Sequence, residues 1–154
     1  MIKIKIIIGA DHQGVEVCDK VIDYIKSNEI NVEKIGLINN ETDDYPDFAN
    51  AVCQKVLEDS GNLGILICGS GIGMSIAANK VNGIRCARVV DENDAFTAKN
   101  HNGANVIAFS SKIDFEEIKK IVDSFIATKS PSEERHIRRI EKVNKIEDGT
   151  YNEL

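Results

Sequence analysis

The sequence predicts a three-layer α/β/α domain, in which a five-stranded parallel sheet carries helices on both faces and is followed by an extra C-terminal helix. Strand-like and helix-like segments alternate along the whole chain, and such alternation favours a parallel sheet because each strand returns through a helix. The segment 63–68 is apolar without alternation, which is typical of a strand covered on both faces. We expect one domain over residues 1–146 and a loose polar tail over 147–154.

The individual elements follow from residue type and spacing. Runs rich in β-branched and apolar residues, bounded by glycine or polar residues, predict strands at 3–9, 31–35, 63–68, 85–90 and 105–109. Apolar residues at helical spacing predict helices at 15–25, 44–57, 72–79, 92–100, 114–126 and from 130 to about 146.

Three of these helices have recognisable starts. Pro46 lies near the first helical position of the second helix, where its fixed backbone angle is favoured. Asp114 precedes Glu117 by three residues and opens the fifth helix. The segment Ser130-Pro131-Ser132-Glu133 predicts a capping box with proline in the first turn of the last helix.

Composition excludes several classes of protein. The 154 residues are 42% hydrophobic and 29% charged, which is the balance of a soluble globular protein. The net charge of −6 repels nucleic acids and anionic membranes, so we expect neither as a partner. We find no membrane span or signal peptide and expect a cytoplasmic protein with four reduced cysteines. None of these forms a C-x-x-C pair, so we expect no metal.

Unusual residues gather at the ends of the predicted strands. Asp11 and His12 follow the first strand, the segment 68–73 (Cys-Gly-Ser-Gly-Ile-Gly) closes the third, and His101-Asn102 precedes the fifth. In a parallel, Rossmann-like sheet ligands bind beyond the carboxyl ends of the strands. We therefore expect a site built from the residues that follow strands.

The glycine loop has two interpretations. The backbone amides of Gly69, Gly71 and Gly73 could turn toward an anion at a helix start, or the loop could be only a tight turn. Its spacing is that of neither a dinucleotide fingerprint nor a P-loop. Cys68 is either a thiolate favoured by the loop amides or a small buried hydrophobe, the usual fate of a free cysteine.

Histidine and arginine give further candidates. Each of the three histidines could serve acid–base chemistry or could be an ordinary surface residue. Arg135 and Arg139 are four residues apart and share a helix face, where they could hold a phosphate. The same helix could equally be a solvated surface with ion pairs. From the residues alone, an α/β domain with an anion site is predicted, but no reaction.

The run 66–80 (Leu-Ile-Cys-Gly-Ser-Gly-Ile-Gly-Met-Ser-Ile-Ala-Ala-Asn-Lys), followed by Gly83-Ile84-Arg85, closely resembles the signature of type B ribose-5-phosphate isomerases, a family that includes galactose- and allose-6-phosphate isomerases. Ala10-Asp11-His12, Asp44-Tyr45-Pro46, His101-Asn102 and Arg135-His136-x-x-Arg139 match in the same order. The resemblance covers residues 3 to 146. It implies a cofactor-free aldose–ketose isomerase of the pentose phosphate pathway, active as a homodimer or a dimer of dimers with shared active sites.

The resemblance also implies residue roles. Cys68 would move a proton between C1 and C2 of the sugar, Ser70 would assist at its oxygens, and the amides of 69–73, Ile72 included, would stabilise the enediolate. His101, with Asp11, would open the furanose ring. The remaining residues would bind substrate: His12, Arg135 and Arg139 at the phosphate, and Tyr45 and Asn102 at the sugar.

Some positions depart from the family pattern. Met74 stands where one branch has a catalytic glutamate, so the chain follows the cysteine branch. Gly103 replaces Asn or Asp, Ser110-Ser111-Lys112 replaces Gly-Gly-Arg, and Glu133 and Glu134 flank Arg135. These departures bear on the substrate. Six-carbon sugar phosphates and a non-catalytic sugar-phosphate binding role are therefore the alternatives to a pentose isomerase.

Overall fold

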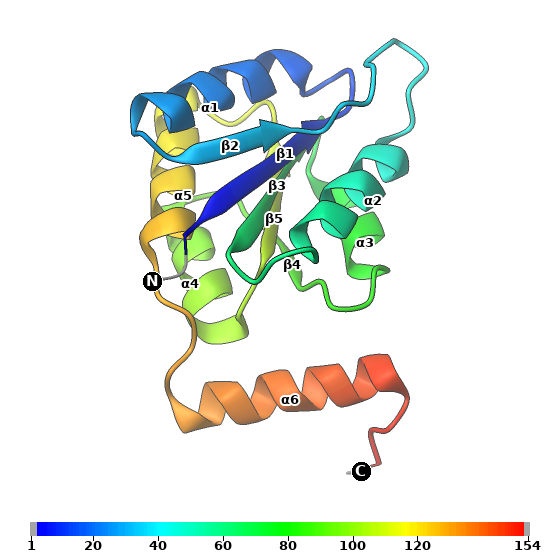
Figure 1. Cartoon of the computed structure of the whole chain (residues 1–154), viewed down its shortest axis with the longest axis vertical. Coiled ribbons are helices and arrows are strands. Elements are labelled where there is room, and N and C mark those ends of the chain that lie inside the picture. The colour runs from blue at the N-terminus through cyan, green and yellow to red at the C-terminus, as the bar shows by residue number, and fades with distance from the viewer. Residues whose placement is uncertain (1–2, 153–154) are drawn as a thin grey trace.

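The computed structural model describes residues 3–152 of the chain (Figure 1). Its strands are β1 (Lys5–Ala10), β2 (Asn31–Lys34), β3 (Asn62–Cys68), β4 (Cys86–Arg88) and β5 (Val106–Ser110). Its helices are α1 (Val15–Ser27), α2 (Tyr45–Val56), α3 (Ile72–Asn79), α4 (Glu92–Asn102), α5 (Phe115–Ala127) and α6 (Glu134–Asp148).

All five strands form one parallel sheet in the order β2-β1-β3-β5-β4, which confirms the predicted fold class. In the register of the two central strands, Ile7 lies opposite Gly64. On the other side of β3, the last residue Cys68 lies opposite Ser110, the last residue of β5. The carboxyl ends of β3 and β5 therefore reach the same edge of the sheet. Among residues 3–152, no helix is long and apolar enough to span a membrane.

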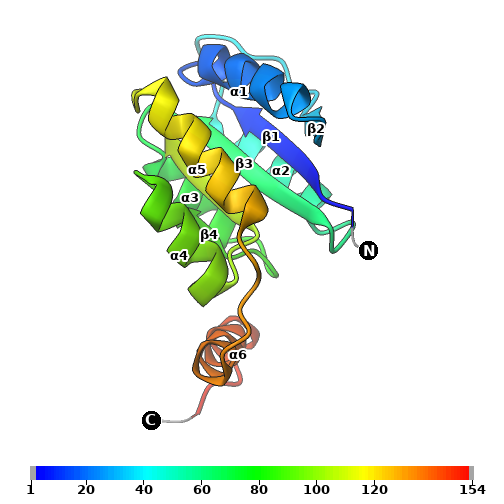
Figure 2. The same ribbon diagram turned by 90° about the vertical axis from the view of Figure 1, so that its left-hand side faces the viewer.

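Successive residues of the central strands point to opposite faces of the sheet, so two cores form. Ile6 and Ile65 pack on one face with residues of α1, α4 and α5. Figure 2 shows these three helices together on that side of the sheet. Ile7 and Leu66 pack on the other face with α2 and α3. Both cores consist mainly of buried aliphatic side chains, joined by Phe109 and Phe125 on the first face and Phe48 on the second, and burial of each such large side chain contributes about 1.5–3 kcal/mol to folding. This explains the non-alternating apolar sequence of β3.

The helix starts agree with the sequence expectations in two cases and differ in one. Pro46 lies in the first turn of α2, and the Asp114 side chain accepts a hydrogen bond from the amide of Glu116 at the start of α5. The capping box predicted at 130–133 is wrong, because these residues do not begin the helix. Helix α6 starts at Glu134, and its N-cap residue Glu133 makes no side-chain cap hydrogen bond.

Helix α6 stands apart from the rest of the fold. Figure 1 shows it below the body, joined to α5 by a segment without regular structure and facing the end of the sheet at which the strands begin. Its only buried residue is His136. The helix continues to Asp148 and closes on Gly149, and the amides of Thr150 and Tyr151 donate to the Lys145 carbonyl. The tail predicted at 147–154 thus begins inside a helix, and its residues 153–154 lie outside the described range.

Candidate active site

The site begins at the point where the chain leaves β1 and β3 for opposite faces of the sheet. Helix α1 follows β1 onto one face, whereas α3 follows β3 onto the other, so a crevice opens between the two strand ends. The amide of Asp11 donates to the carbonyl of Ile67 (3.3 Å) and holds the strand ends together. Asp11, His12, Cys68 and the glycine loop thus share one carboxyl edge, as the sequence predicts.

The glycine loop wraps around the sulfur of Cys68. The amide of Gly71 donates to Cys68 Sγ at 3.1 Å, and the amide of Ile72 donates to Ser70 Oγ at 3.2 Å. Gly71 has a φ of 77°, and a Cβ atom there would lie 2.8 Å from Cα of Phe109, so glycine is required on both counts. An amide donor on the sulfur favours its negative charge, as the thiolate interpretation requires.

The ring of Tyr45 covers the loop from the side of α2. A Cβ atom at Gly73 would lie 2.7 Å from this ring, so the glycine permits a close approach of ring and backbone. Tyr45 is 40% exposed, so the outer part of its side chain is accessible beside the loop. On the other side, the Ser110 hydroxyl donates to the Gly69 carbonyl at 2.7 Å. Ser110, a departure from the family pattern, therefore fixes the loop to the end of β5.

The other cysteines have different surroundings. Burial raises the pKa of Cys18 and of Cys53 to about 12, and burial likewise raises the pKa of Cys86. A thiol with such a pKa stays protonated at neutral pH and is not a base. These three residues therefore have a structural role, and Cys68 is left as the candidate for chemistry.

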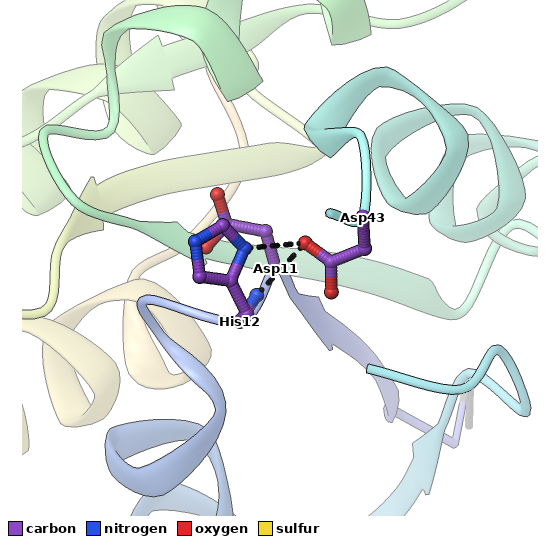
Figure 3. A group of neighbouring side chains, drawn as sticks. All are labelled: Asp11, His12 and Asp43. Carbon is purple, nitrogen blue, oxygen red and sulfur yellow. Dashed lines mark hydrogen bonds and ion pairs between the residues drawn. The ribbon is translucent and has the colours of Figure 1, made fainter. Parts of the chain in front are cut away.

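Asp11, His12 and Asp43 form a compact polar group at the mouth of the crevice (Figure 3). Asp43 Oδ1 accepts hydrogen bonds from the backbone amide of His12 (3.1 Å) and from its Nδ1 (2.7 Å). The hydrogen bond to Asp43 raises the pKa of His12 above 6.5. Burial raises the pKa of Asp11, a shift that the hydrogen bond from the Gln13 amide opposes. Burial also acts to raise the pKa of Asp43, but the hydrogen bonds from His12 outweigh it and lower the value.

This group also has the composition of a metal site. One ligand atom from each of the three side chains lies within 4.8 Å of the others. Each side chain is, however, already bound within the protein: Nδ1 of His12 to Asp43, and Asp11 to the amide of Gln13 at 3.0 Å. Hydrogen bonds thus account for the grouping, and the residues do not require a metal.

His101 and Asn102 lie at the opposite edge of the sheet. They end α4, which runs back from the carboxyl edge and is followed by β5 at Val106. Because Cys68 lies opposite Ser110, the four steps of β5 separate the two edges by roughly 13 Å at about 3.3 Å per residue. One chain therefore does not bring His101 and Asn102 to Cys68, or His101 to Asp11.

A second cluster surrounds His101. Its ring stacks on that of His136 of α6, with centroids 4.3 Å apart and planes 14° from parallel. Both histidines, Asn102 and Arg139 line a cavity of about 930 Å³ between α6 and the body. Nε2 of His136 is buried and has no hydrogen-bond partner among residues 3–152. Burial lowers the pKa of His136, and the neighbouring His101 and Arg135 lower it further.

The remaining positions near this cluster are also accounted for. Arg135 is exposed and pairs with Glu133 (Nε to Oε2, 2.8 Å), whereas Glu134 pairs with Arg138 (3.3 Å). Gly103 has a φ of 60° and caps α4, which explains a glycine at this position. The predicted phosphate ligands are thus divided, with His12 at the carboxyl edge and both arginines on α6.

The sequence analysis assigned no specific role in the site to three residues of these clusters. His136 lies within the matched Arg-His-x-x-Arg motif, so its position was signalled. Arg88 of β4 donates from Nε to the Ser70 carbonyl (2.9 Å), and a basic residue late in a strand was a weak signal. Asp43 lies in a loop 31 residues from His12, and no pattern marks it.

Fold and site together define an α/β protein with a thiol inside a glycine loop at the switch point of its sheet. The chain belongs to the ribose/galactose isomerase family, whose model matches residues 6–143. This finding confirms the family that the sequence resembles.

Individual relatives extend this result. The chain is 42% identical over 149 residues to the probable ribose-5-phosphate isomerase B of Mycoplasma genitalium, covering 94% of this chain and 97% of that protein. It is 36% identical to ribose-5-phosphate isomerase B of Mycobacterium tuberculosis, over 93% of this chain and 90% of the relative.

Solved structures of ribose-5-phosphate isomerases B have the same fold as this chain. Ribose-5-phosphate isomerase B of Clostridium thermocellum has a TM-score of 0.89 at 36% identity, over 95% of this chain and 99% of that chain. The Mycoplasma genitalium enzyme with bound ribulose-5-phosphate has a TM-score of 0.89 at 40% identity, over 96% of this chain and 99% of that chain.

Proposed function

We propose that this chain is a ribose-5-phosphate isomerase, which interconverts ribose 5-phosphate and ribulose 5-phosphate without a cofactor. The observation that carries the proposal is the Gly71 amide on the sulfur of Cys68, 3.1 Å away, at the switch-point crevice. The names of the relatives and the ribulose-5-phosphate bound to the Mycoplasma genitalium structure support the substrate. The pentose phosphate pathway of the cytoplasm would supply it, and four free cysteines suit a reducing compartment.

The reaction needs a base and an oxyanion site. In the direction of ribulose, the Cys68 thiolate removes the proton from C2, and the C2–H electron pair forms the C1–C2 double bond of an enediolate. Backbone amides of residues 69–73 stabilise the negative charge that moves onto O1. The resulting thiol returns the proton to C1, while a proton passes from O2 to O1 with the help of Ser70. No electrons are gained or lost, so the reaction requires no redox carrier.

We infer that two chains form each active site. His101, which would open the furanose ring with Asp11, lies at the opposite edge of its own chain, as do Arg135 and Arg139 on α6. A second chain would bring these groups to the Cys68 crevice, where the arginines would join His12 at the phosphate. Tyr45 and Asn102 would then enclose the sugar from different chains.

The surface supports such an assembly. Helix α6 has 15 residues and buries only one of their side chains, so packing on its own chain stabilises it little. An isolated helix of this length is only marginally stable in water, and further packing is therefore needed. Large apolar residues are exposed on α3 and α6, and a second copy would cover them: Ile72, Ile76, Ile137, Val143 and Ile146. We propose a homodimer, or a dimer of dimers, with shared active sites.

Direct assay tests the function. Purified protein should convert ribose 5-phosphate to ribulose 5-phosphate, and Cys68→Ala should lower kcat at least ~10²-fold, the scale for losing a proton-transfer group. Cys53→Ala is the matched control, since it removes a buried thiol outside the crevice. Faster turnover of allose or galactose 6-phosphate would assign a six-carbon substrate. Binding of the sugar phosphate without proton exchange at C2 would reject catalysis.

A further inference from the structure

The contact between the loop preceding α2 and the end of β1 points to a further functional residue. We propose that Asp43 is a positioning residue that orients the His12 ring and keeps it as an imidazolium cation for the substrate phosphate. This inference rests on the proposed function, because it assigns His12 to phosphate binding. It adds a residue to the site that no motif of the sequence marks.

Asp43 is held as firmly as a positioning residue should be. Its side chain is only 5% exposed, and both of its oxygens accept two hydrogen bonds. Oδ1 accepts from the backbone amide and Nδ1 of His12, while Oδ2 accepts from the Asn39 side chain (3.1 Å) and the Asn40 amide (3.2 Å). Asn39 also donates to the carbonyl of Ala10 at 2.7 Å, which fixes the loop to β1.

The hydrogen bond determines which nitrogen of His12 is available. With Nδ1 donating to Asp43, the ring is held in one orientation, and in the imidazolium form Nε2 carries a second proton that it can donate to a ligand. The ring is one-third exposed, so Nε2 can reach a ligand in the crevice. A charged ring donates a stronger hydrogen bond to phosphate than a neutral one.

The charge of His12 depends on the groups that face it. These are Asp43, Asp11 and Glu41, all acidic, and each raises the pKa of His12, Asp43 most strongly through its hydrogen bond. The positive charge of His12 matters for phosphate binding because a second predicted phosphate ligand is already occupied. Arg135 of α6 pairs with Glu133 in the single chain. A chain without Asp43 would retain His12 but would lose the interaction that raises its pKa most, so the ring would become neutral at a lower pH.

The first test measures His12 itself. The chain has three histidines, so the ring protons of His12 can be assigned by NMR with one His12→Asn variant and titrated in the apo protein. We expect the pKa of His12 to lie above 6.5 in the parent and to fall in Asp43→Asn, which removes the largest of the interactions that raise it. A parent His12 that titrates below 6.5, or one that Asp43→Asn leaves unmoved, would overturn the proposal. This readout does not depend on enzymatic activity.

The second test measures substrate binding. In Asp43→Asn, KM for ribose 5-phosphate should rise by about 10-fold at a pH between the His12 pKa values that NMR gives for variant and parent, the loss of one charge-assisted hydrogen bond, with kcat nearly unchanged. The ratio of variant to parent KM cancels the titration of the substrate phosphate and should approach one at a pH below both pKa values, where His12 is charged in both. Glu41→Gln is the matched control: it removes the same charge from the same loop without a hydrogen bond to His12, and its KM should change far less.

A double variant separates positioning from general damage. In the His12→Asn background, Asp43→Asn should add no further rise in KM if Asp43 acts through His12. An equal rise in both backgrounds, or a fall in kcat at constant KM, would overturn the positioning role. If the parent lacks isomerase activity but His12 shifts in the NMR titration as expected, the proposed function fails while the Asp43–His12 coupling stands.

Discussion

Two heterodimers distinguish a shared active site from a site within one chain. In the first, one chain carries Cys68→Ala and the other carries His101→Ala; in the second, both substitutions lie in one chain and the partner is the parent. The edges that hold Cys68 and His101 lie roughly 13 Å apart within a chain, so we expect each crevice to use Cys68 of one chain and His101 of the other.

The expected activities follow from two-fold symmetry. The first heterodimer combines the intact Cys68 and the intact His101 in one of its two sites, so its activity should be about half that of the parent. The second heterodimer pairs each intact residue with a substituted one, so both of its sites should be defective and its rate about 10²-fold lower. A site within one chain predicts the reverse order for the two heterodimers.

The assay needs pure heterodimers. Co-expression with two different affinity tags and tandem purification provides them, and mass measurement in solution confirms two chains. Conversion of ribose 5-phosphate is then measured at a fixed concentration of sites. Half the parent activity in the second heterodimer, together with little activity in the first, would refute the shared site and with it the proposed role of His101.

Two further predictions concern stability. Gly71→Ala should lower the unfolding temperature by more than ~2–8 °C, since the left-handed φ of 77° alone costs about 1–2 kcal/mol and the new Cβ would meet Phe109. Gly149 has a similar φ of 73° but open space around it, so Gly149→Ala measures the cost of the φ angle alone. An equal loss of unfolding temperature in both variants would refute the steric argument. The pKa of His136 is lowered by burial, so the unfolded state binds more protons below pH 6.5, and stability should fall as pH drops through 6.5 toward the folded pKa. Denaturant titrations at several pH values should show this fall, and it should vanish in His136→Gln.

Much of the fold could be predicted because periodicity reports which faces are buried. The non-alternating strand that ends at Cys68 indicated a central position in a parallel sheet, and the parallel arrangement placed the residues after β1 and β3 at one edge. The contact of the Gly71 amide with Cys68 could be predicted in general terms, because alternating glycines at a helix start expose backbone amides.

Other features depend on contacts that no local pattern contains. The predicted capping box is wrong because the helix begins four residues later than Ser130, with Glu133 in the extended N-cap conformation. The contact of Asp43 with His12 arises where a loop folds back over 31 residues. This loop is held by hydrogen bonds from the Asn39 side chain and the Asn40 amide to Asp43, contacts that form only once the loop has folded.

The separation of His101 from Cys68 was contained in the topology, since a helix between two parallel strands must end at the edge where the next strand starts. This separation means that activity would depend on the proposed assembly. A lone chain would hold the thiol and loop at one edge and the ring-opening histidine at the other, and could not complete the reaction. Association of two chains would then both cover the exposed apolar residues of α6 and complete the active sites. Specific activity should therefore fall on dilution below the dimer dissociation constant, in step with the loss of dimer measured by light scattering.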